Sequence, residues 1–296
     1  MLVWLNGRCL HVRDARLSVL DRGLLHGDGL YDTWRTYDGE PFAVAAHLRR
    51  LAAAARQLRL PSPGPAAPWT RRARRLVARN GLRDATIRLT ITRGGAGDSL
   101  VPDRPAPPTQ LLTVRRLPPD LAEQQAQGIA AVLLPFPRDV APPWGGLKLL
   151  GHPSAVVGRM LALRRGAREG LYVTADDEVT EGTTSNLFLV EGGGIVTPPT
   201  TGEVLGGVTR DLVLRLARGA GIAVREERIA TARLRRAREI FVTASTVEIL
   251  PVVRVDGRRI TSGRPGPVTH ALQAAYRRAV ATAVARARAS RVAASR

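Results

Sequence analysis

The stretch Trp144-Gly-Gly-Leu-Lys-Leu-Leu-Gly-His152 contains Lys148, the only lysine in this chain of 296 residues. The other 44 of its 45 lysine and arginine residues are arginine. Arginine supplies charge and hydrogen bonds almost as well as lysine, but it stays protonated and cannot attack a carbonyl carbon to form a Schiff base. The retained amine predicts that Lys148 binds an aldehyde cofactor or a carbonyl substrate. The alternative is chance survival of one lysine in an arginine-biased composition.

The composition is typical of a globular protein with a sizeable interior. A chain of this length with 44% hydrophobic residues fits one large domain or two of moderate size. No apolar run approaches the roughly 20 residues needed to cross a membrane, and the first residues show no signal peptide. A single cysteine, Cys9, excludes an intrachain disulfide and suits a reducing compartment, so we expect a cytoplasmic protein.

The net charge of +20 raises the question of nucleic-acid binding. The arginines are spread along the whole chain, aromatic residues make up only 4%, and no nucleic-acid-binding motif is present. We therefore expect neither a nucleic-acid partner nor a membrane partner. No metal site is expected either, because the five histidines are scattered without a ligand at a familiar spacing.

Hydrophobic periodicity predicts a mixture of helices and strands. Apolar residues recur at helical spacing from Leu48 to Leu58, which predicts a helix over 47–60. Further helices are expected over 69–80, 153–165, 209–218 and 268–289. Strands are expected over 2–5, 10–12, 30–37, 85–92, 110–114, 129–134, 240–243 and 252–255, and within 171–197 with turns at 176–177 and 192–194.

A proline-containing stretch beginning Leu117-Pro-Pro-Asp120 is the best candidate for a domain linker. We therefore expect a small N-terminal α/β domain over 1–117, a linker over 118–127 and a larger C-terminal domain over 128–296.

Three features point to a phosphorylated ligand. Gly206-Gly-Val-Thr-Arg210 leads directly into a helix, whose first N–H groups form an anion site, although glycine and threonine there also serve ordinary capping. Thr243-Ala-Ser-Thr246 follows a strand and offers hydroxyl groups, as many turns do. Glu181 lies among buried strands and needs a cationic partner, which could be a protonated pyridine nitrogen or one of the many arginines.

Taken together, these residues resemble the class IV aminotransferases, the fold-type IV family of pyridoxal-phosphate enzymes. The resemblance is collinear from Asn6 to about Gly266. Its landmarks are Asp21-Arg-Gly23, Gly27-Asp-Gly-Leu-Tyr-Asp-Thr33, His47-Leu-Arg-Arg-Leu51, Lys148, Thr180-Glu-Gly182, Ser185-Asn-Leu-Phe188, Leu205-Gly-Gly-Val-Thr-Arg210 and Pro251-Val252.

The resemblance implies a cofactor, pyridoxal 5′-phosphate, and a role for each matching residue. Lys148 would form the Schiff base and move the substrate proton, and Glu181 would pair with the pyridine nitrogen. The phosphate would be held by Arg50, Val208, Thr209, Ala244 and Ser245. The family fold has two domains of mixed α/β (α+β) class, the larger one with a barrel-like sheet, and its members are homodimers with shared active sites.

The resemblance leaves the substrate open, and Tyr31, Arg88 and His152 are the residues expected to contact it. Family members commonly have an Asn-Tyr pair after the lysine, where this chain has Gly151-His152, and His152 could equally be a capping or packing residue. The strand around Arg88 lacks the tyrosine usual in branched-chain enzymes. The loop after Thr92-Arg-Gly94 lacks the arginine and histidine pair of D-amino-acid enzymes, which argues against D-amino acids.

An aminotransferase that moves an amino group between an amino acid or amine and a 2-keto acid is the leading hypothesis. The alternative is 4-amino-4-deoxychorismate lyase, which releases pyruvate and 4-aminobenzoate on the same fold. A non-catalytic phosphate-binding protein is disfavoured, because both Lys148 and Glu181 are retained.

Overall fold

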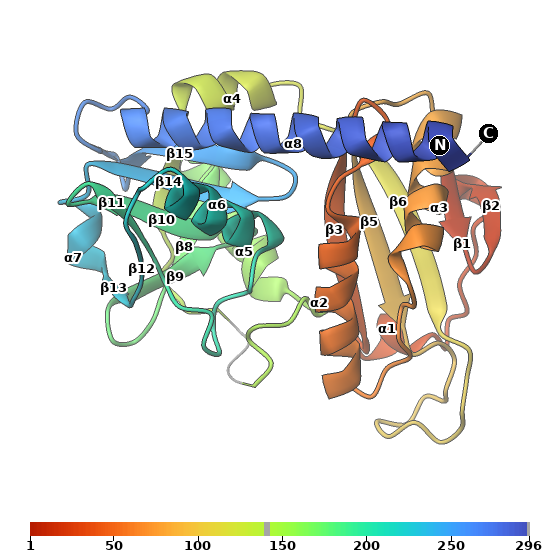
Figure 1. The fold of residues 1–296 in the computed structure, drawn as a ribbon. Helices are drawn as coiled ribbons and strands as arrows, with labels where there is room; N and C mark the ends of the chain where they lie inside the picture. The colour runs from red at the N-terminus through yellow and green to blue at the C-terminus, as the bar shows by residue number, and fades with distance from the viewer. Residues whose placement is uncertain (139–142, 295–296) are drawn as a thin grey trace. The chain divides into compact units, whose positions relative to one another are not determined.

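The computed structural model describes residues 1–138 and 143–294, which form two compact units (Figure 1). Unit 1 comprises Met1–Leu117, Leu147–Gly151 and Val280–Arg296, and unit 2 comprises Pro118–Gly146 and His152–Ala279. Lys148 therefore groups with the N-terminal part of the chain, although it lies far along the sequence. Each unit is described by itself below.

Unit 1 is built on an antiparallel sheet of six strands in the order β2-β1-β6-β5-β3-β4. The strands are β1 (Leu2–Leu5), β2 (Arg8–His11), β3 (Gly29–Tyr37), β4 (Glu40–Pro41), β5 (Ala85–Thr92) and β6 (Thr109–Arg116). The turn between β1 and β2 has positive φ at both Asn6 and Gly7, the geometry that favours this Asn-Gly pair in a two-residue hairpin. The predicted N-terminal hairpin is confirmed.

One face of this sheet carries the core of unit 1 (Figure 1). Helices α2 (Val44–Gln57) and α3 (Ala66–Arg79) pack their apolar sides on it, and α1 (Arg22–Leu25) and the 3-10 helix η1 (Val12–Asp14) are short. Alternation along β3 places Leu30 and Trp34 in that core, so Tyr31 lies on the opposite face. The sheet thus has one apolar face and one half-buried face with polar side chains.

Helix α2 begins and ends three residues earlier than predicted. It ends at Gln57 because Leu58 leaves helical geometry and Arg59 adopts a positive φ of 52°. Leu60 is nevertheless buried in the core. The apolar spacing continues past the end of the helix, so periodicity alone does not show where the helix ends.

Unit 2 contains a ten-stranded sheet that closes on itself. The closed path is β10-β14-β15-β7-β8-β9, with β9 paired back to β10, so six strands form a barrel. The ten strands are β7 (Ile129–Leu133), β8 (Glu169–Val173), β9 (Glu178–Gly182), β10 (Asn186–Glu191), β11 (Gly194–Thr197), β12 (Val224–Glu226), β13 (Ile229–Ala230), β14 (Glu239–Ala244), β15 (Glu248–Val255) and β16 (Arg258–Arg259). The predicted barrel-like sheet is confirmed, as is the mixed α/β class.

The barrel strands contribute alternate apolar residues to one cluster, which includes Leu171, Leu187, Val242 and Leu250. Helices α5 (Pro153–Arg164) and α6 (Val208–Gly219) pack on β8 and β14 respectively, and α7 (Thr231–Leu234) is short. Helix α8 (Pro267–Ala294) begins in unit 2, and its later residues belong to unit 1.

The stretch 118–127, expected to be a linker, contains helix α4 (Leu121–Gln127) and belongs to unit 2. Its proline pair lies just before the helix, and Leu121 and Gln125, one turn apart, are both buried. A second difference concerns 171–197, where residues 183–185 form an additional turn between β9 and β10. None of the described helices is long and apolar enough to cross a membrane.

Candidate active site

Lys148 is held against the beginning of β3 within unit 1. Its carbonyl oxygen accepts a hydrogen bond from the Tyr31 N–H at 3.0 Å, and Leu149 forms an antiparallel bridge with Leu30. The side chain is half-buried, and its Nζ lies 3.5 Å from the Tyr31 hydroxyl oxygen. A backbone fixed at this point keeps the amine close to the half-buried face of the sheet.

Tyr31 and Arg88 lie against each other on that face. The guanidinium carbon of Arg88 is 3.6 Å from the centroid of the Tyr31 ring, and Arg88 Nε donates to the Thr90 hydroxyl at 3.3 Å. Burial lowers the pKa of Arg88, and the charge of Arg115 adds to that effect. Tyr31 is paired with Thr90, so it lies on the other side of Arg88 from Thr86, the position where β5 lacks a tyrosine. A guanidinium, a hydroxyl and an amine come together there.

Arg50 is bound by a buried carboxylate. Arg50 Nε and Nη2 donate to the two oxygens of Asp32 at 3.0 and 2.7 Å, and the Nδ1–H of His47 donates to Asp32 Oδ1 at 2.9 Å. Burial alone would raise the pKa of Asp32, but the Arg50 guanidinium beside it holds that pKa well below its usual range. Burial also lowers the pKa of His47, so this imidazole is neutral near pH 7. Asp32 therefore fixes the orientation of Arg50.

Glu181 lies at the end of β9 in unit 2 and is buried. Its Oε1 is 2.9 Å from Arg138 Nη1, while Oε2 accepts from the Leu205 N–H at 3.0 Å and from Asn186 Nδ2 at 3.3 Å. The ion pair with an arginine, left open by the sequence, is therefore present. This set of cationic and N–H partners stabilises an ionised carboxylate, which is the form that pairs with a protonated ring nitrogen.

The beginning of α6 lies close to these residues in unit 2. Its N-cap, Gly207, has no side chain that could accept a hydrogen bond from the first N–H groups of the helix. A Cβ added to Gly207 would collide with Oδ1 of Asn186, so only glycine allows this close approach. The hydroxyls of Thr209 and Ser245 are 3.4 Å apart. Uncapped N–H groups and two hydroxyls form a ready site for an anion such as phosphate.

The remaining predicted site residues lie in unit 2 as well. Val208 is the first residue of α6, and Ala244 ends β14, where the Val247 N–H donates to its carbonyl oxygen at 3.2 Å. His152 is the N-cap of α5 through its backbone, with its carbonyl oxygen accepting from the Val156 N–H at 3.2 Å. Its side chain does not cap the helix.

The structure thus brings the predicted residues together in two groups, one in each unit. Lys148, Tyr31 and Arg88 are neighbours in unit 1, and Thr209 and Ser245 are neighbours in unit 2. Sequence reasoning assigned no role to Asp32, His47, Arg138 or Asn186. A carboxylate at Asp32 was detectable, because it occupies a core-facing position of a strand between Leu30 and Trp34.

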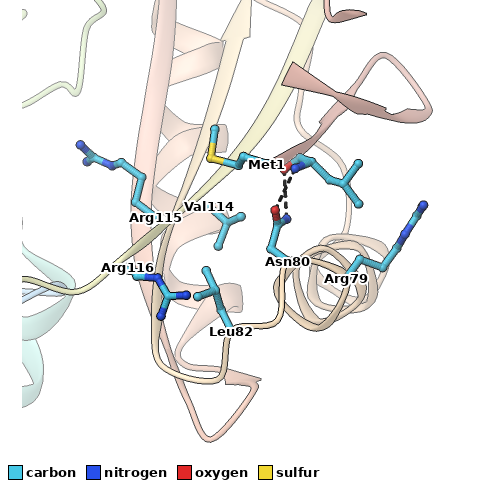
Figure 2. A pocket seen from close by; sticks show the side chains of 8 residues that line it. Met1, Arg79, Asn80, Leu82, Val114, Arg115 and Arg116 are labelled. Carbon is cyan, nitrogen blue, oxygen red and sulfur yellow. Dashed lines mark hydrogen bonds between the residues drawn. The ribbon is translucent and has the colours of Figure 1, made fainter. Parts of the chain in front are cut away.

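Two cavities lie away from these groups. One of about 410 Å³ in unit 1 is lined by Met1, Leu2, Arg79, Asn80, Leu82, Val114, Arg115 and Arg116. Figure 2 shows that the three arginine side chains extend in different directions, so they do not converge on a common anion. The other, about 520 Å³ in unit 2, is lined by Leu133, Thr231, Leu234, Arg235, Val255, Asp256, Arg258, Arg259 and Ile260. Neither contains a predicted site residue, and no cluster of metal-binding side chains exists among the residues described.

Comparison with known proteins places this arrangement in a family. Residues 29–255 match the family described as amino-transferase class IV. The chain is 35% identical, over 94% of its length and 96% of the other, to a Methanocaldococcus jannaschii protein provisionally named a branched-chain-amino-acid aminotransferase. It is 31% identical to the D-alanine aminotransferase of Bacillus licheniformis, over 97% and 99% of the two chains.

The fold is also similar to a solved structure, the T.th. branched-chain amino acid aminotransferase with pyridoxamine 5′-phosphate. The TM-score is 0.86, with 29% sequence identity, and the match covers 94% of this chain and 93% of that one. The family pattern extends over most of the chain and includes Lys148, Glu181 and the beginning of α6. The chain therefore belongs to the class IV aminotransferase family.

Proposed function

We propose that the protein is a pyridoxal-phosphate-dependent aminotransferase that moves an amino group from an apolar, branched-chain amino acid to a 2-oxo acid. One observation carries the proposal. The only lysine of the chain is held by its backbone against the beginning of β3, with its Nζ 3.5 Å from the Tyr31 hydroxyl, and Tyr31 stacks on Arg88. An amine, a phenol and a guanidinium in one place suit the attachment of a cofactor and the recognition of an amino-acid carboxylate.

The family resemblance assigns residues of each unit to a group of the cofactor. Glu181, a buried carboxylate with cationic and N–H partners, would face the ring nitrogen. The α6 N–H groups of Val208 and Thr209, with Ser245 and its neighbour Ala244, would hold the phosphate. Arg50, oriented by Asp32, would add a cationic contact to the phosphate. When bound, pyridoxal phosphate supplies a carbonyl that takes up amino groups and a ring that withdraws electrons.

The groups around Lys148 would act on the substrate. Lys148 Nζ is the amine that attaches the cofactor and moves the proton of the substrate α-carbon. Arg88, planar and half-buried, is suited to bind a carboxylate in a bidentate manner, and Tyr31 can donate a hydrogen bond to the same group. The family resemblance also assigns His152, the N-cap residue of α5, to the substrate side.

The branched-chain class is preferred over D-alanine for two reasons. The more similar of the two relatives above carries the branched-chain name. The loop after Gly94 also lacks the arginine and histidine pair associated with D-amino acids. The comparisons give the lyase alternative no support over transamination.

A homodimer in the cytoplasm is part of the proposal. Buried Arg22 donates to the carbonyl oxygens of Ser99 and Leu100. It thereby connects two apolar segments of unit 1, residues 17–25 and residues 99–101. The exposed apolar residues of these segments are Leu17, Val19, Leu20, Leu24, Leu25, Leu100 and Val101. Such a surface is suited to contact a second subunit. Light scattering of the purified protein should give twice the mass of the chain.

The function is tested by adding single amino donors to the cofactor-loaded protein without a 2-oxo acid. L-leucine, L-isoleucine or L-valine should convert the cofactor to its amine form, with one equivalent of the matching 2-oxo acid released. Conversion by D-alanine alone would overturn the substrate class. Release of pyruvate from aminodeoxychorismate, with no response to any amino acid, would overturn transamination itself.

A further inference from the structure

A row of three polar residues crosses neighbouring strands of the unit 2 barrel. Asn186 on β10 is paired with Glu181 on β9 and with Thr243 on β14. Directly paired residues project from the same face of a sheet, so the three side chains share one face. The next pair, Leu187 and Val242, belongs to the apolar cluster of the barrel and therefore projects from the other face.

Two members of the row have clear hydrogen-bond partners, and the third has none. Asn186 Nδ2 donates to Glu181 Oε2 at 3.3 Å and to the Leu205 carbonyl oxygen at 2.8 Å. The Thr243 hydroxyl finds no partner within the described part of the chain, although the residue is only 1% exposed. A buried, unpaired hydroxyl is destabilising, and such groups in folded proteins call for an explanation.

The surroundings of Thr243 belong to the candidate cofactor site. Ser245, two residues further on, lies 3.4 Å from Thr209 at the beginning of α6. Gly207, also at the beginning of α6, packs against Asn186, the residue paired with Thr243. Thr243 thus lies between a residue assigned to the ring nitrogen and a residue assigned to the phosphate.

We propose that Thr243 is a further cofactor-binding residue, whose hydroxyl forms a hydrogen bond with a polar atom of the bound cofactor. The inference rests on the proposed function, because it takes pyridoxal phosphate as the ligand of unit 2. It explains why a buried hydroxyl has no hydrogen-bond partner in the folded chain. In the apoprotein the Thr243 hydroxyl stays without a partner, and binding of pyridoxal phosphate supplies one.

Replacement of Thr243 by valine tests this inference, because the shape is kept and only the hydroxyl is lost. Removing an unpaired hydroxyl should raise the melting temperature of the apoprotein by about 2–4 °C. The same change should weaken pyridoxal phosphate binding about three- to tenfold, the effect of losing one hydrogen bond. Thr243→Ser keeps the hydroxyl and should restore the affinity. Scanning fluorimetry and quenching of tryptophan fluorescence by added pyridoxal phosphate give the two readings.

Thr197 provides a matched control in the same unit. It is fully buried, but its hydroxyl donates to the Leu187 carbonyl oxygen at 2.7 Å. Thr197→Val should therefore lower the apoprotein melting temperature and leave the affinity for pyridoxal phosphate unchanged. The two valine variants are expected to change apoprotein stability in opposite directions.

The outcomes separate this inference from the function on which it rests. If Thr243→Val lowers apoprotein stability as Thr197→Val does, or binds pyridoxal phosphate as tightly as the wild type, Thr243 is not a cofactor ligand, while the proposed function stands. If the wild-type chain does not bind pyridoxal phosphate, both proposals are wrong. The role of Thr243 is supported if Thr243→Val raises the melting temperature of the apoprotein and weakens pyridoxal phosphate binding, and if Thr243→Ser restores the affinity.

Discussion

Units 1 and 2 hold their polar site groups in position in different ways. In unit 1 the groups are held by contacts between side chains: Asp32 orients Arg50, and Tyr31 stacks on Arg88. In unit 2 much of the anion site is main chain, at an uncapped helix beginning that approaches Asn186 through Gly207. The Arg50 group of unit 1 therefore depends on charge pairing, and the anion site of unit 2 depends on backbone geometry.

This difference determines which substitutions should be harmful in each unit. Deleting one partner of a buried charge pair leaves the other charge uncompensated, which is costly. The first turn of a helix keeps its N–H donors whatever side chains it carries. It does not tolerate an added side-chain atom where its backbone packs closely against another residue. A charge deletion should thus affect the Arg50 group of unit 1, and an added methyl group should affect the anion site of unit 2.

The largest expected effect comes from Lys148. Lys148→Ala should abolish the visible absorbance of the lysine-linked cofactor and lower kcat by at least about 1,000-fold, because no other amine in the chain can replace it at that position. Lys148→Arg is the matched control, since it keeps the charge but cannot attack a carbonyl. Both variants should be equally inactive. Wild-type turnover by either one would exclude the proposed mechanism.

Asp32 tests the charge pairing of unit 1. Asp32→Ala should lower the free energy of unfolding by about 3–5 kcal/mol, because Arg50 loses its buried partner. Asp14 in the same unit is a control: it forms an exposed pair with Arg13 at 3.9 Å, so Asp14→Ala should cost less than about 1 kcal/mol. Denaturant titration measures both. Equal effects would mean that the buried pair adds nothing.

Adjacent glycines test the backbone geometry of unit 2. Gly207→Ala should weaken pyridoxal phosphate binding by about tenfold or more, because the new Cβ collides with Asn186 and must displace the beginning of α6. Gly206→Ala should have little effect, since nothing lies within 4 Å of a Cβ built there. Titration of the apoproteins compares the two. Similar affinities would contradict the close approach.

The smallest effect concerns pH and His47. Because the pKa of His47 lies below its ordinary 6.5 in the folded protein, the unfolded chain binds more protons as the pH falls through that value. Stability should therefore decrease as the pH is lowered from about 7 to 5, and His47→Gln should reduce this slope. Asp32 affects stability only at lower pH. Because its pKa is lowered in the folded protein, its ionised form stabilises the fold above the ordinary pKa of 3.8, and this stabilisation is lost as the pH falls below that value. Melting temperatures across this pH range provide the test, and an unchanged slope in the variant would assign the effect elsewhere.

Much of this arrangement could be predicted from the sequence. Periodicity predicts the long strands and helices, since each buries one apolar face, and the order and spacing of the short motifs from Asn6 to about Gly266 predict the family. The prolines before helix α4 are typical of a linker, so the sequence does not indicate the helix that follows them. The apolar strands on either side of residues 183–185 likewise give no sign of the turn between them.

The partners of the site residues were harder to predict than the residues themselves. The pairing of Arg50 with Asp32 and the pairing of Glu181 with Arg138 depend on strand register and loop conformation, which side-chain patterns do not specify. Arg138 is 43 residues before Glu181, and many other arginines were equally eligible. The stacking of Tyr31 on Arg88 likewise requires the β3–β5 pairing.

The most direct test is to locate the bound cofactor chemically. The protein is loaded with pyridoxal phosphate, reduced with borohydride, digested and analysed by mass spectrometry. The account predicts one label per chain, on Lys148, the only lysine. A label confined to the N-terminal amine of Met1, or no label at all, would contradict it.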